Sequence, residues 1–184
     1  MEAYPGKRAF DLLLAGTACL IYAPVVTAFA LATVIEDGGP AFFVQTRVGR
    51  QRRPFKVFKL RTMRDGKVTN VGRWLRRTGL DELPQFLNVW RGDMSVVGPR
   101  PLTVEDVRRL GWDAPQLDWR FSAKPGITGL SQILAGQGVA ASRRLDRLYL
   151  RRQQPVLDAC LVALSGVANL LGKRRVARLV RSYG

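Results

Sequence analysis

The sequence contains no histidine and only two cysteines among its 184 residues. Without histidine there can be no Ser-His-Asp triad, no Cys-His nucleophile pair and no His-ligated zinc. Cys19 and Cys160 are too few and too far apart for a disulfide framework or a zinc knuckle. Any catalysis must therefore come from carboxylates, hydroxyls, lysine and arginine.

Acidic residues are also scarce, with 14 Asp and Glu against 30 Lys and Arg and a formal charge of +16. Such an excess implies polyanionic partners, namely nucleic acid, anionic lipid or phosphorylated substrates. The excess lies entirely after residue 40, and most of it is arginine, the side chain suited to bidentate phosphate binding. Hydrophobic residues make up 47% of the chain, so a packed core is expected.

A long apolar run covers residues 9–35 and is interrupted only by Asp11. It exceeds the roughly 20 residues that a membrane span needs. Pro24 lies near its centre and should bend a helix there. Basic residues flank both ends, so they give no single orientation. We expect a re-entrant helix that enters and leaves the bilayer on one face, with an ordinary span and a soluble core helix as alternatives.

The rest of the chain predicts an α+β, mostly helical fold. Residues 41–61 indicate a β-hairpin around a basic, Gly-containing loop. Apolar periodicity and turn residues predict helices in the following segments: 69–79, 81–91, 103–121 with interruptions at Gly111 and Pro115, 142–151 and 156–171. The tail 173–181 is basic and amphipathic, as expected at a membrane surface. We therefore expect a membrane-inserted segment, 1–38, and a catalytic domain with amphipathic surface helices, 39–184.

Asp81 and Glu82 form the most informative acidic pair. Pro84 is tolerated only in a first helical turn, so a helix should begin near Asp81. Both carboxylates would then lie at its positive end, where the ionised form is favoured and free backbone N–H groups can bind phosphate. Adjacent acids at a helix start are also ordinary capping residues.

The arginines around this pair favour a functional site. Arg76 and its neighbours precede the acids, and Arg100 follows them between two prolines. Prolines on both sides restrict the backbone and so lower the entropy lost on holding a phosphate ligand. Carboxylates enclosed by arginine suit a divalent cation such as Mg²⁺ together with a phosphorylated substrate. A solvated surface charge or a lipid headgroup contact remains the alternative for each arginine.

These blocks resemble the bacterial sugar transferases, the monotopic polyprenyl-phosphate phosphoglycosyl transferases that begin surface-glycan synthesis. The resemblance covers nearly the whole chain and looks like the small, minimal form of the family. The matching blocks are Lys7-Arg8-Ala9-Phe10-Asp11, Gln45-Thr46-Arg47-Val48-Gly49, Phe58-Lys59-Leu60-Arg61-Thr62-Met63, Leu80-Asp81-Glu82-Leu83-Pro84-Gln85, Gly92-Asp93-Met94-Ser95-Val96-Val97-Gly98-Pro99-Arg100-Pro101 and Pro125-Gly126-Ile127-Thr128-Gly129 with Gln132.

The resemblance implies a reaction. A sugar-1-phosphate would move from a nucleoside-diphosphate sugar, most simply a UDP-sugar, to polyprenyl (undecaprenyl) phosphate. Asp81 is implied as the nucleophile that forms a covalent phosphosugar intermediate, and Glu82 as the Mg²⁺ ligand with Asp81 close to the metal. The resemblance further implies substrate- and phosphate-binding roles for Lys59, Arg76, Arg100, Gln85 and Thr128. A carboxylate nucleophile needs no histidine base.

The resemblance also implies a location and partners. Nucleotide sugars are cytosolic, so the basic domain is expected on the cytoplasmic face of the bacterial inner membrane, attracted to anionic lipids. No nucleic acid partner is implied, and a homodimer is left open. The chain departs from the family at Ala23-Pro24, where Ser-Pro is usual, and after Gln132, where Asn-Gly-Arg often follows. The competing hypothesis is a membrane-anchored basic module that binds anionic lipid or nucleic acid.

Overall fold

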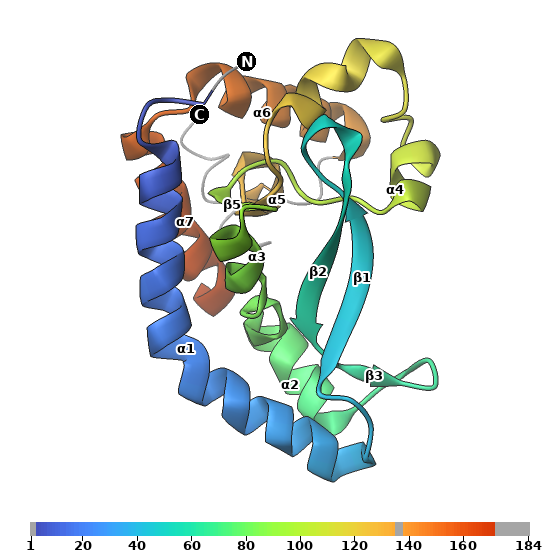
Figure 1. Ribbon diagram of the computed structural model, residues 1–184. Coiled ribbons are helices and arrows are strands. Elements are labelled where there is room, and N and C mark those ends of the chain that lie inside the picture. Colours follow the sequence, from blue (N-terminus) through green and yellow to red (C-terminus); the bar gives the residue numbers. More distant parts are fainter. Residues whose placement is uncertain (1–2, 135–137, 172–184) are drawn as a thin grey trace.

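The computed structural model describes residues 3–134 and 138–171, and the predicted tail 173–181 lies outside them. The fold is α+β and mostly helical, as predicted (Figure 1). The helices are α1 Lys7–Asp37, α2 Asn70–Thr78, α3 Gln85–Arg91, α4 Val104–Arg109, α5 Leu130–Ile133, α6 Gly138–Arg152 and α7 Pro155–Leu171, with 3₁₀ turns η1 Arg50–Arg52, η2 Leu80–Glu82 and η3 Pro115–Ser122. The strands are β1 Phe42–Val48, β2 Pro54–Leu60, β3 Met63–Arg64, β4 Lys67–Val68, β5 Ser95–Val97 and β6 Gly126–Thr128.

Helix α1 is long, apolar and bent. Its most apolar window has a mean hydropathy of 2.2, only 6% of that window is buried, and the helix is long enough to cross a membrane. Pro24 lies inside the helix and removes one backbone donor, and Figure 1 shows the helix bending midway. The predicted bend is therefore present although Ala23 stands where the family usually has serine. A soluble core helix would be mostly buried, so this alternative does not fit α1.

Both ends of α1 are bonded to the rest of the chain. At its start, Lys7 lies between two buried carboxylates, 3.0 Å from Asp11 and 2.7 Å from Asp158 of α7. At its end, Asp37 forms an ion pair with Arg61. Glu36 accepts hydrogen bonds from the first backbone N–H groups of α2, the position where a helix dipole favours an anion.

The hairpin is formed by β1 and β2, which pair antiparallel with Phe43 opposite Lys59. Asn88 of α3 fixes the helix to this hairpin, since its side chain donates to the Lys56 carbonyl at 2.7 Å and accepts from the Phe58 N–H at 3.2 Å. The buried face of α3 contains Gln85, Asn88 and Val89, whereas the apolar residue Trp90 of the same helix is 56% exposed.

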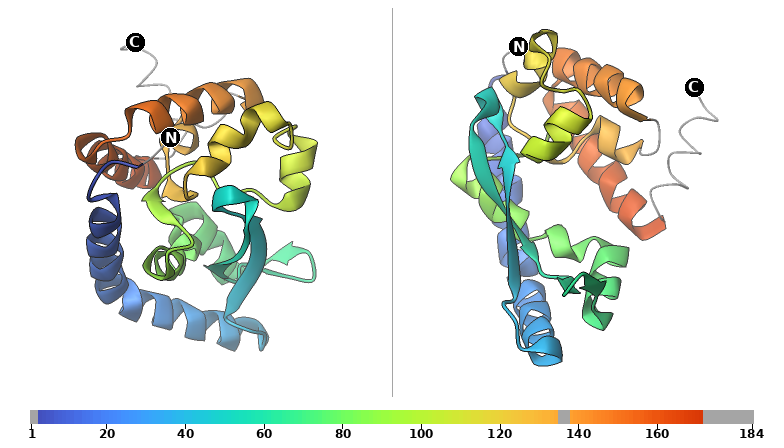
Figure 2. Two further views of the ribbon diagram at one scale, coloured as in Figure 1. Left: turned by 45° about the horizontal axis from the view of Figure 1, so that its top comes forward. Right: turned by 90° about the vertical axis from the view of Figure 1, so that its right-hand side faces the viewer.

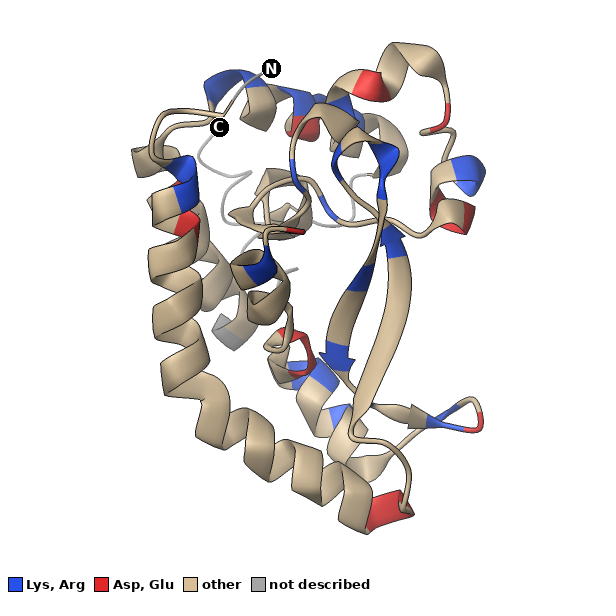
Figure 3. Ribbon diagram, viewed as in Figure 1, with Lys and Arg blue, Asp and Glu red and all other residues tan. Residues whose placement is uncertain are grey.

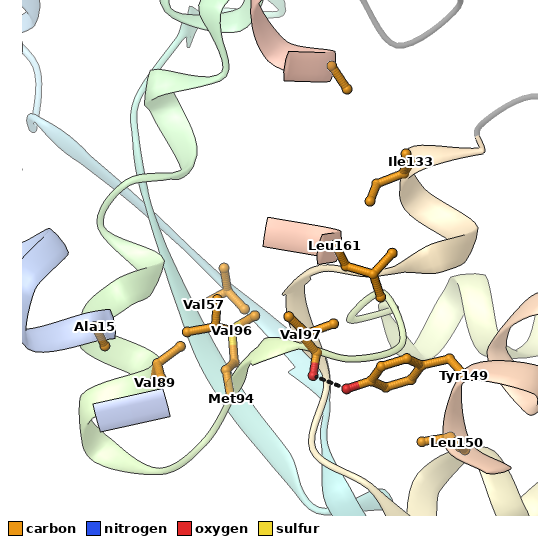
Figure 4. Packing of buried hydrophobic residues seen from close by; sticks show 11 residues of the cluster. Ala15, Val57, Val89, Met94, Val96, Val97, Ile133, Tyr149, Leu150 and Leu161 are labelled. Carbon is orange, nitrogen blue, oxygen red and sulfur yellow. Dashed lines mark hydrogen bonds between the residues drawn. The ribbon is translucent and has the colours of Figure 1, made fainter. Parts of the chain in front are cut away.

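The main core lies where α1, α3, β5, α6 and α7 meet (Figure 4). Val57, Val89, Met94, Val97 and Leu161 are almost completely buried there. The short parallel pair β5–β6 runs through this core. Helix α4 and the 3₁₀ turn η3 lie with α6 at the end of the molecule where α1 begins (Figure 2).

Two glycines allow the strand β6 to approach the loop after β5. A Cβ atom at Gly126 would lie 2.1 Å from the Gly98 nitrogen, and one at Gly129 would lie 2.2 Å from the Gly98 carbonyl oxygen. Any other residue would push these backbones apart. Glycine at these two positions therefore permits the close backbone approach.

Candidate active site

The two acidic residues lie on the 3₁₀ turn η2, directly after α2. Gly79 ends α2 in the left-handed conformation, with φ at 75°, and so redirects the chain into η2. The helical run that begins near Asp81 is confirmed, but it begins as a 3₁₀ turn, and α3 itself starts only after Pro84. In Figure 3 the acids of η2 lie next to the basic positions of α2 and β2.

A cavity of about 710 Å³ opens beside η2. Five predicted site residues line it: Asp81, Glu82, Lys59, Arg76 and Thr128. They come from η2, β2, α2 and β6, so segments distant in the sequence converge on one site. The volume is in the range of pockets that bind small molecules and cofactors.

Two cations, Lys59 and Arg76, line the cavity together with the acids. Lys59 Nζ lies 2.7 Å from Glu82 Oε1, and its ammonium group carries three donors, so it can also bind a phosphate oxygen. Arg76 Nε donates to Thr62 Oγ1 at 2.8 Å, which fixes the guanidinium on the cavity wall.

The pKa of the Asp81 carboxyl is raised above its ordinary value. Burial of the carboxylate is the main cause, and the charge of Glu82 adds to it, while Lys59 and Arg76 oppose the rise. This differs from the expectation that the helix start would favour the ionised form. The desolvation of Asp81 and the repulsion from its neighbour outweigh the stabilisation by its own backbone N–H and the nearby cations.

Gln85 and Arg100 lie at a smaller, adjoining pocket instead. This pocket also contains Lys59 and Glu82, so it shares a wall with the main cavity. Gln85 is buried, whereas Arg100 is exposed. The structure therefore brings Arg100 to the edge of the acidic pair rather than into the cavity beside Asp81.

The cavity has further lining residues to which the sequence analysis gave no role. Gln45 and Arg47 of β1 lie on the same face as Phe43, which pairs with Lys59. Because side chains alternate along a strand, this two-residue spacing is the signal that could have found them. Helix α7 contributes Ser165 and Asn169, and nothing in its apolar pattern indicated this.

The donor set fits Mg²⁺ when the substrate is counted as part of the site. Asp81 and Glu82 offer hard oxygen ligands. Burial, and after it the charge of Glu82, raises the pKa of Asp81, and a cation bound between the two acids would offset that repulsion. Within residues 3–134 and 138–171 no group of three or more His, Cys, Asp or Glu side chains could enclose a metal. A Mg²⁺ ion would thus complete its coordination with phosphate oxygens and water.

The later acids Asp146 and Asp158 lie in buried networks outside the cavity. Asp158 is completely buried and accepts hydrogen bonds from the Tyr4 and Tyr149 hydroxyls, at 3.0 Å and 2.9 Å, besides its ion pair with Lys7. Asp146 is buried in an ion pair with Arg120. None of these residues lines the cavity beside Asp81.

Comparisons with known proteins identify the family of the chain. The family model for bacterial sugar transferases matches residues 2–172. A UDP-glucose:undecaprenyl-phosphate glucose-1-phosphate transferase of Caulobacter vibrioides is 42% identical over 155 residues, covering 77% of this chain and 58% of the relative. The Escherichia coli K12 protein of the same name is 42% identical over 188 aligned residues, covering 91% and 40%.

A third relative differs in its sugar. The UDP-N-acetylgalactosamine-undecaprenyl-phosphate N-acetylgalactosaminephosphotransferase of Aeromonas hydrophila is 37% identical over 175 residues, covering 85% of this chain and 41% of the relative. The chain thus spans 40% to 58% of the length of these three relatives. Since the family model extends over nearly the whole chain, the protein belongs to the bacterial sugar transferase family.

Proposed function

We propose that the protein transfers a sugar-1-phosphate from a nucleoside-diphosphate sugar to polyprenyl phosphate. The observation that carries the proposal is the Asp81–Glu82 pair on the wall of a cavity of about 710 Å³ that Lys59 and Arg76 also line. Relatives named as UDP-glucose:undecaprenyl-phosphate transferases support a UDP-sugar donor and an undecaprenyl phosphate acceptor.

The proposed chemistry proceeds in two displacements at one phosphorus atom. The Asp81 carboxylate attacks the β-phosphorus of the donor, an Asp81 O–P bond forms, and the P–O bond to the nucleoside monophosphate breaks. A phosphate oxygen of the polyprenyl acceptor then attacks the same phosphorus and releases Asp81 as a carboxylate. No general base is needed, because both nucleophiles are oxygen anions.

The residues around Asp81 provide binding and electrostatic stabilisation. Arg76 and Lys59 place positive charge at the cavity wall where phosphoryl oxygens gain charge in the transition state. Glu82, with Asp81 beside it, would hold Mg²⁺, which supplies charge neutralisation for the diphosphate when bound. Thr128 of β6 also lines the cavity and would offer a hydroxyl to the substrate.

The reaction is tested by incubating the purified protein with undecaprenyl phosphate, Mg²⁺ and a panel of nucleotide sugars. We expect release of a nucleoside monophosphate with one donor. In Asp81→Asn the rate of this release should fall by about 10³-fold or more. Asp118→Asn is the matched control, since Asp118 is exposed and pairs with Arg52 away from the cavity. Full turnover by Asp81→Asn would exclude this nucleophile.

The covalent step has its own measurement. With a sugar-labelled donor and no acceptor, the wild-type protein should retain label in a bond that hydroxylamine cleaves, as expected for an acyl phosphate. Asp81→Asn should retain none, whereas Asp118→Asn should behave as the wild type. Label on both variants would contradict an Asp81 intermediate.

The metal requirement is tested separately. We expect EDTA to abolish transfer and Mg²⁺ to restore it, and Glu82→Gln to need a higher Mg²⁺ concentration for half-maximal rate. Unchanged transfer after complete removal of divalent cations would contradict a Mg²⁺ site at these residues.

The proposed topology is a re-entrant α1 on the cytoplasmic face of the inner membrane. Both ends of α1 are bonded to one globular body, through Lys7 at its start and Asp37 at its end, so both ends should lie on one side of the bilayer. The basic catalytic domain would then contact anionic lipids.

Cysteine labelling tests this arrangement. In a Cys19→Ala/Cys160→Ala background, Ala3→Cys and Pro40→Cys should react with a membrane-impermeant reagent in inside-out vesicles, and neither should react in right-side-out vesicles. Both positions are exposed in the structure. Reaction of the two positions from opposite sides would establish a spanning helix instead.

A further inference from the structure

A buried ion pair contacts the loop that carries Arg100. Arg120 of η3 and Asp146 of α6 are 5% and 3% exposed, and Arg120 Nε lies 2.9 Å from Asp146 Oδ2. The guanidinium also stacks 4.4 Å from the centre of the Trp112 ring. A buried arginine is held rigidly when a carboxylate pairs with its charge and its N–H donors all have acceptors.

A second donor of this arginine fixes the Arg100 backbone. Arg120 Nη2 donates to the Arg100 carbonyl oxygen at 2.8 Å. On the other side, Arg47 Nη1 donates to the carbonyl oxygen of Pro101 at 3.2 Å. The peptide carbonyls at and after Arg100 are therefore both anchored, while the side chain of Arg100 is left to line the pocket shared with Lys59 and Glu82.

The Asp146 carboxylate also bonds to α5. Asp146 Oδ1 accepts a hydrogen bond from Ser131 Oγ at 2.6 Å. Ser131 lies in α5, next to Gln132, which lines both the main cavity and the smaller pocket. One buried carboxylate thus connects the Arg100 loop, through Arg120, to the segment that carries Gln132.

We propose that Arg120 is a positioning residue that acts through Arg100. Paired with Asp146, Arg120 holds the Arg100 backbone in the position from which the Arg100 side chain can bind a phosphate of the nucleotide sugar. This inference rests on the proposed function, because it assigns the donor phosphate as the group that Arg100 meets.

The variant Arg120→Lys separates the two contacts of Arg120. A lysine can keep the ion pair with Asp146, but a single ammonium cannot reproduce the forked contact that also reaches the Arg100 carbonyl. We expect KM for the donor to rise about tenfold, the effect of losing one charge-assisted hydrogen bond, with kcat within about twofold. Arg143→Lys is the matched control, because Arg143 also lies over Trp112 but donates to the carbonyls of Leu110 and Gly111.

A double-mutant cycle identifies the route of the effect. If Arg120 acts through Arg100, Arg120→Lys should change KM no further in an Arg100→Ala background. Additive effects of the two substitutions, or an unchanged KM in Arg120→Lys, would overturn the proposal. Should Arg120→Lys fail to fold, Asp146→Asn is the second variant, expected to raise KM in the same direction by a smaller factor, and an unchanged KM there would count against it equally.

Binding of UDP, followed by thermal shift, keeps this inference separable from the proposed reaction. Arg120→Lys should bind UDP about tenfold more weakly than wild type and Arg143→Lys, whether or not turnover is seen. Absence of transfer by the wild type with every donor would refute the proposed function. Equal UDP affinity in wild type and Arg120→Lys would refute the role of Arg120.

Discussion

The core carboxylate Asp158 and the cavity carboxylate Asp81 have opposite environments. Asp158 is fully buried and is surrounded by Lys7, Tyr4 and Tyr149. Asp81 is half-buried beside a second acid, and within the described part of the chain no other side chain donates a hydrogen bond to it. The satisfied acid stabilises the fold, whereas the incompletely compensated acid keeps a carboxylate available to react.

The largest effect on stability is expected from removing the positive charge of Lys7 from the core. Lys7→Met leaves Asp11 and Asp158 buried with one positive charge fewer, and should lower the free energy of unfolding by about 3–5 kcal/mol. Chemical denaturation in detergent or nanodiscs measures it. Lys67→Met, at an exposed position of β4, is the control and should change it by less than about 0.5 kcal/mol. Equal stabilities of the two variants would show that the Lys7 network is not structural.

A smaller effect is expected from one hydroxyl of the same network. Tyr149 OH lies 3.0 Å from the Val97 carbonyl oxygen (Figure 4) and 2.9 Å from Asp158 Oδ1. Burial and the charge of Asp158 raise the pKa of the Tyr149 hydroxyl. Tyr149→Phe removes one buried hydroxyl and should destabilise the protein by about 1–2 kcal/mol.

The kinetics of Tyr149→Phe show whether this hydroxyl acts in the fold or in the reaction. Since Tyr149 does not line the cavity, kcat and KM should stay within about twofold of wild type at a temperature where the variant is folded. A large loss of kcat without a loss of stability would place the hydroxyl in the reaction rather than in the fold.

The smallest effect on stability is predicted at Asp81, where the substitution should stabilise the protein rather than destabilise it. Its pKa is higher in the folded state than in the unfolded chain, so ionisation opposes folding, and stability falls as pH rises through the interval between the two values. Above that interval the loss is constant. Asp81→Asn should therefore raise Tm slightly at pH 7, by about 1–2 °C, and the gain should disappear in acid.

The control for this pH dependence is Asp118→Asn, at an exposed ion pair with Arg52. It should not raise Tm at pH 7. If Asp81→Asn lowered Tm at neutral pH, the carboxylate would be stabilised in the fold, and the contrast between Asp81 and the core acids would fail.

The sequence predicts the local elements better than the long-range contacts. The β-hairpin and the helical turn at Asp81 follow from local patterns, so β1, β2 and η2 appear where they were expected. The helix of residues 81–91 is divided because Pro84 has no backbone N–H to continue the hydrogen-bond ladder from η2 into α3.

The contacts between distant segments were not predictable in this way. Asp11 looked only like an interruption of an apolar run, yet it accepts hydrogen bonds from Ser95 and Val96 across more than 80 residues. Likewise, the apolar pattern of α7 gave no sign that Asn169 would line the cavity. Such contacts depend on how helices pack, and periodicity reports only which face of a helix is apolar.

The bend of α1 has a mechanical consequence for the bilayer. From Lys7 to Pro24 the helix is about 26 Å long, shorter than the roughly 30 Å of hydrocarbon in a bilayer. In the proposed topology the first arm of the helix therefore enters the hydrocarbon core without crossing it, and the bent helix acts as a wedge. Wedges insert most readily where lipid packing is loose, so membrane curvature should influence where the protein settles.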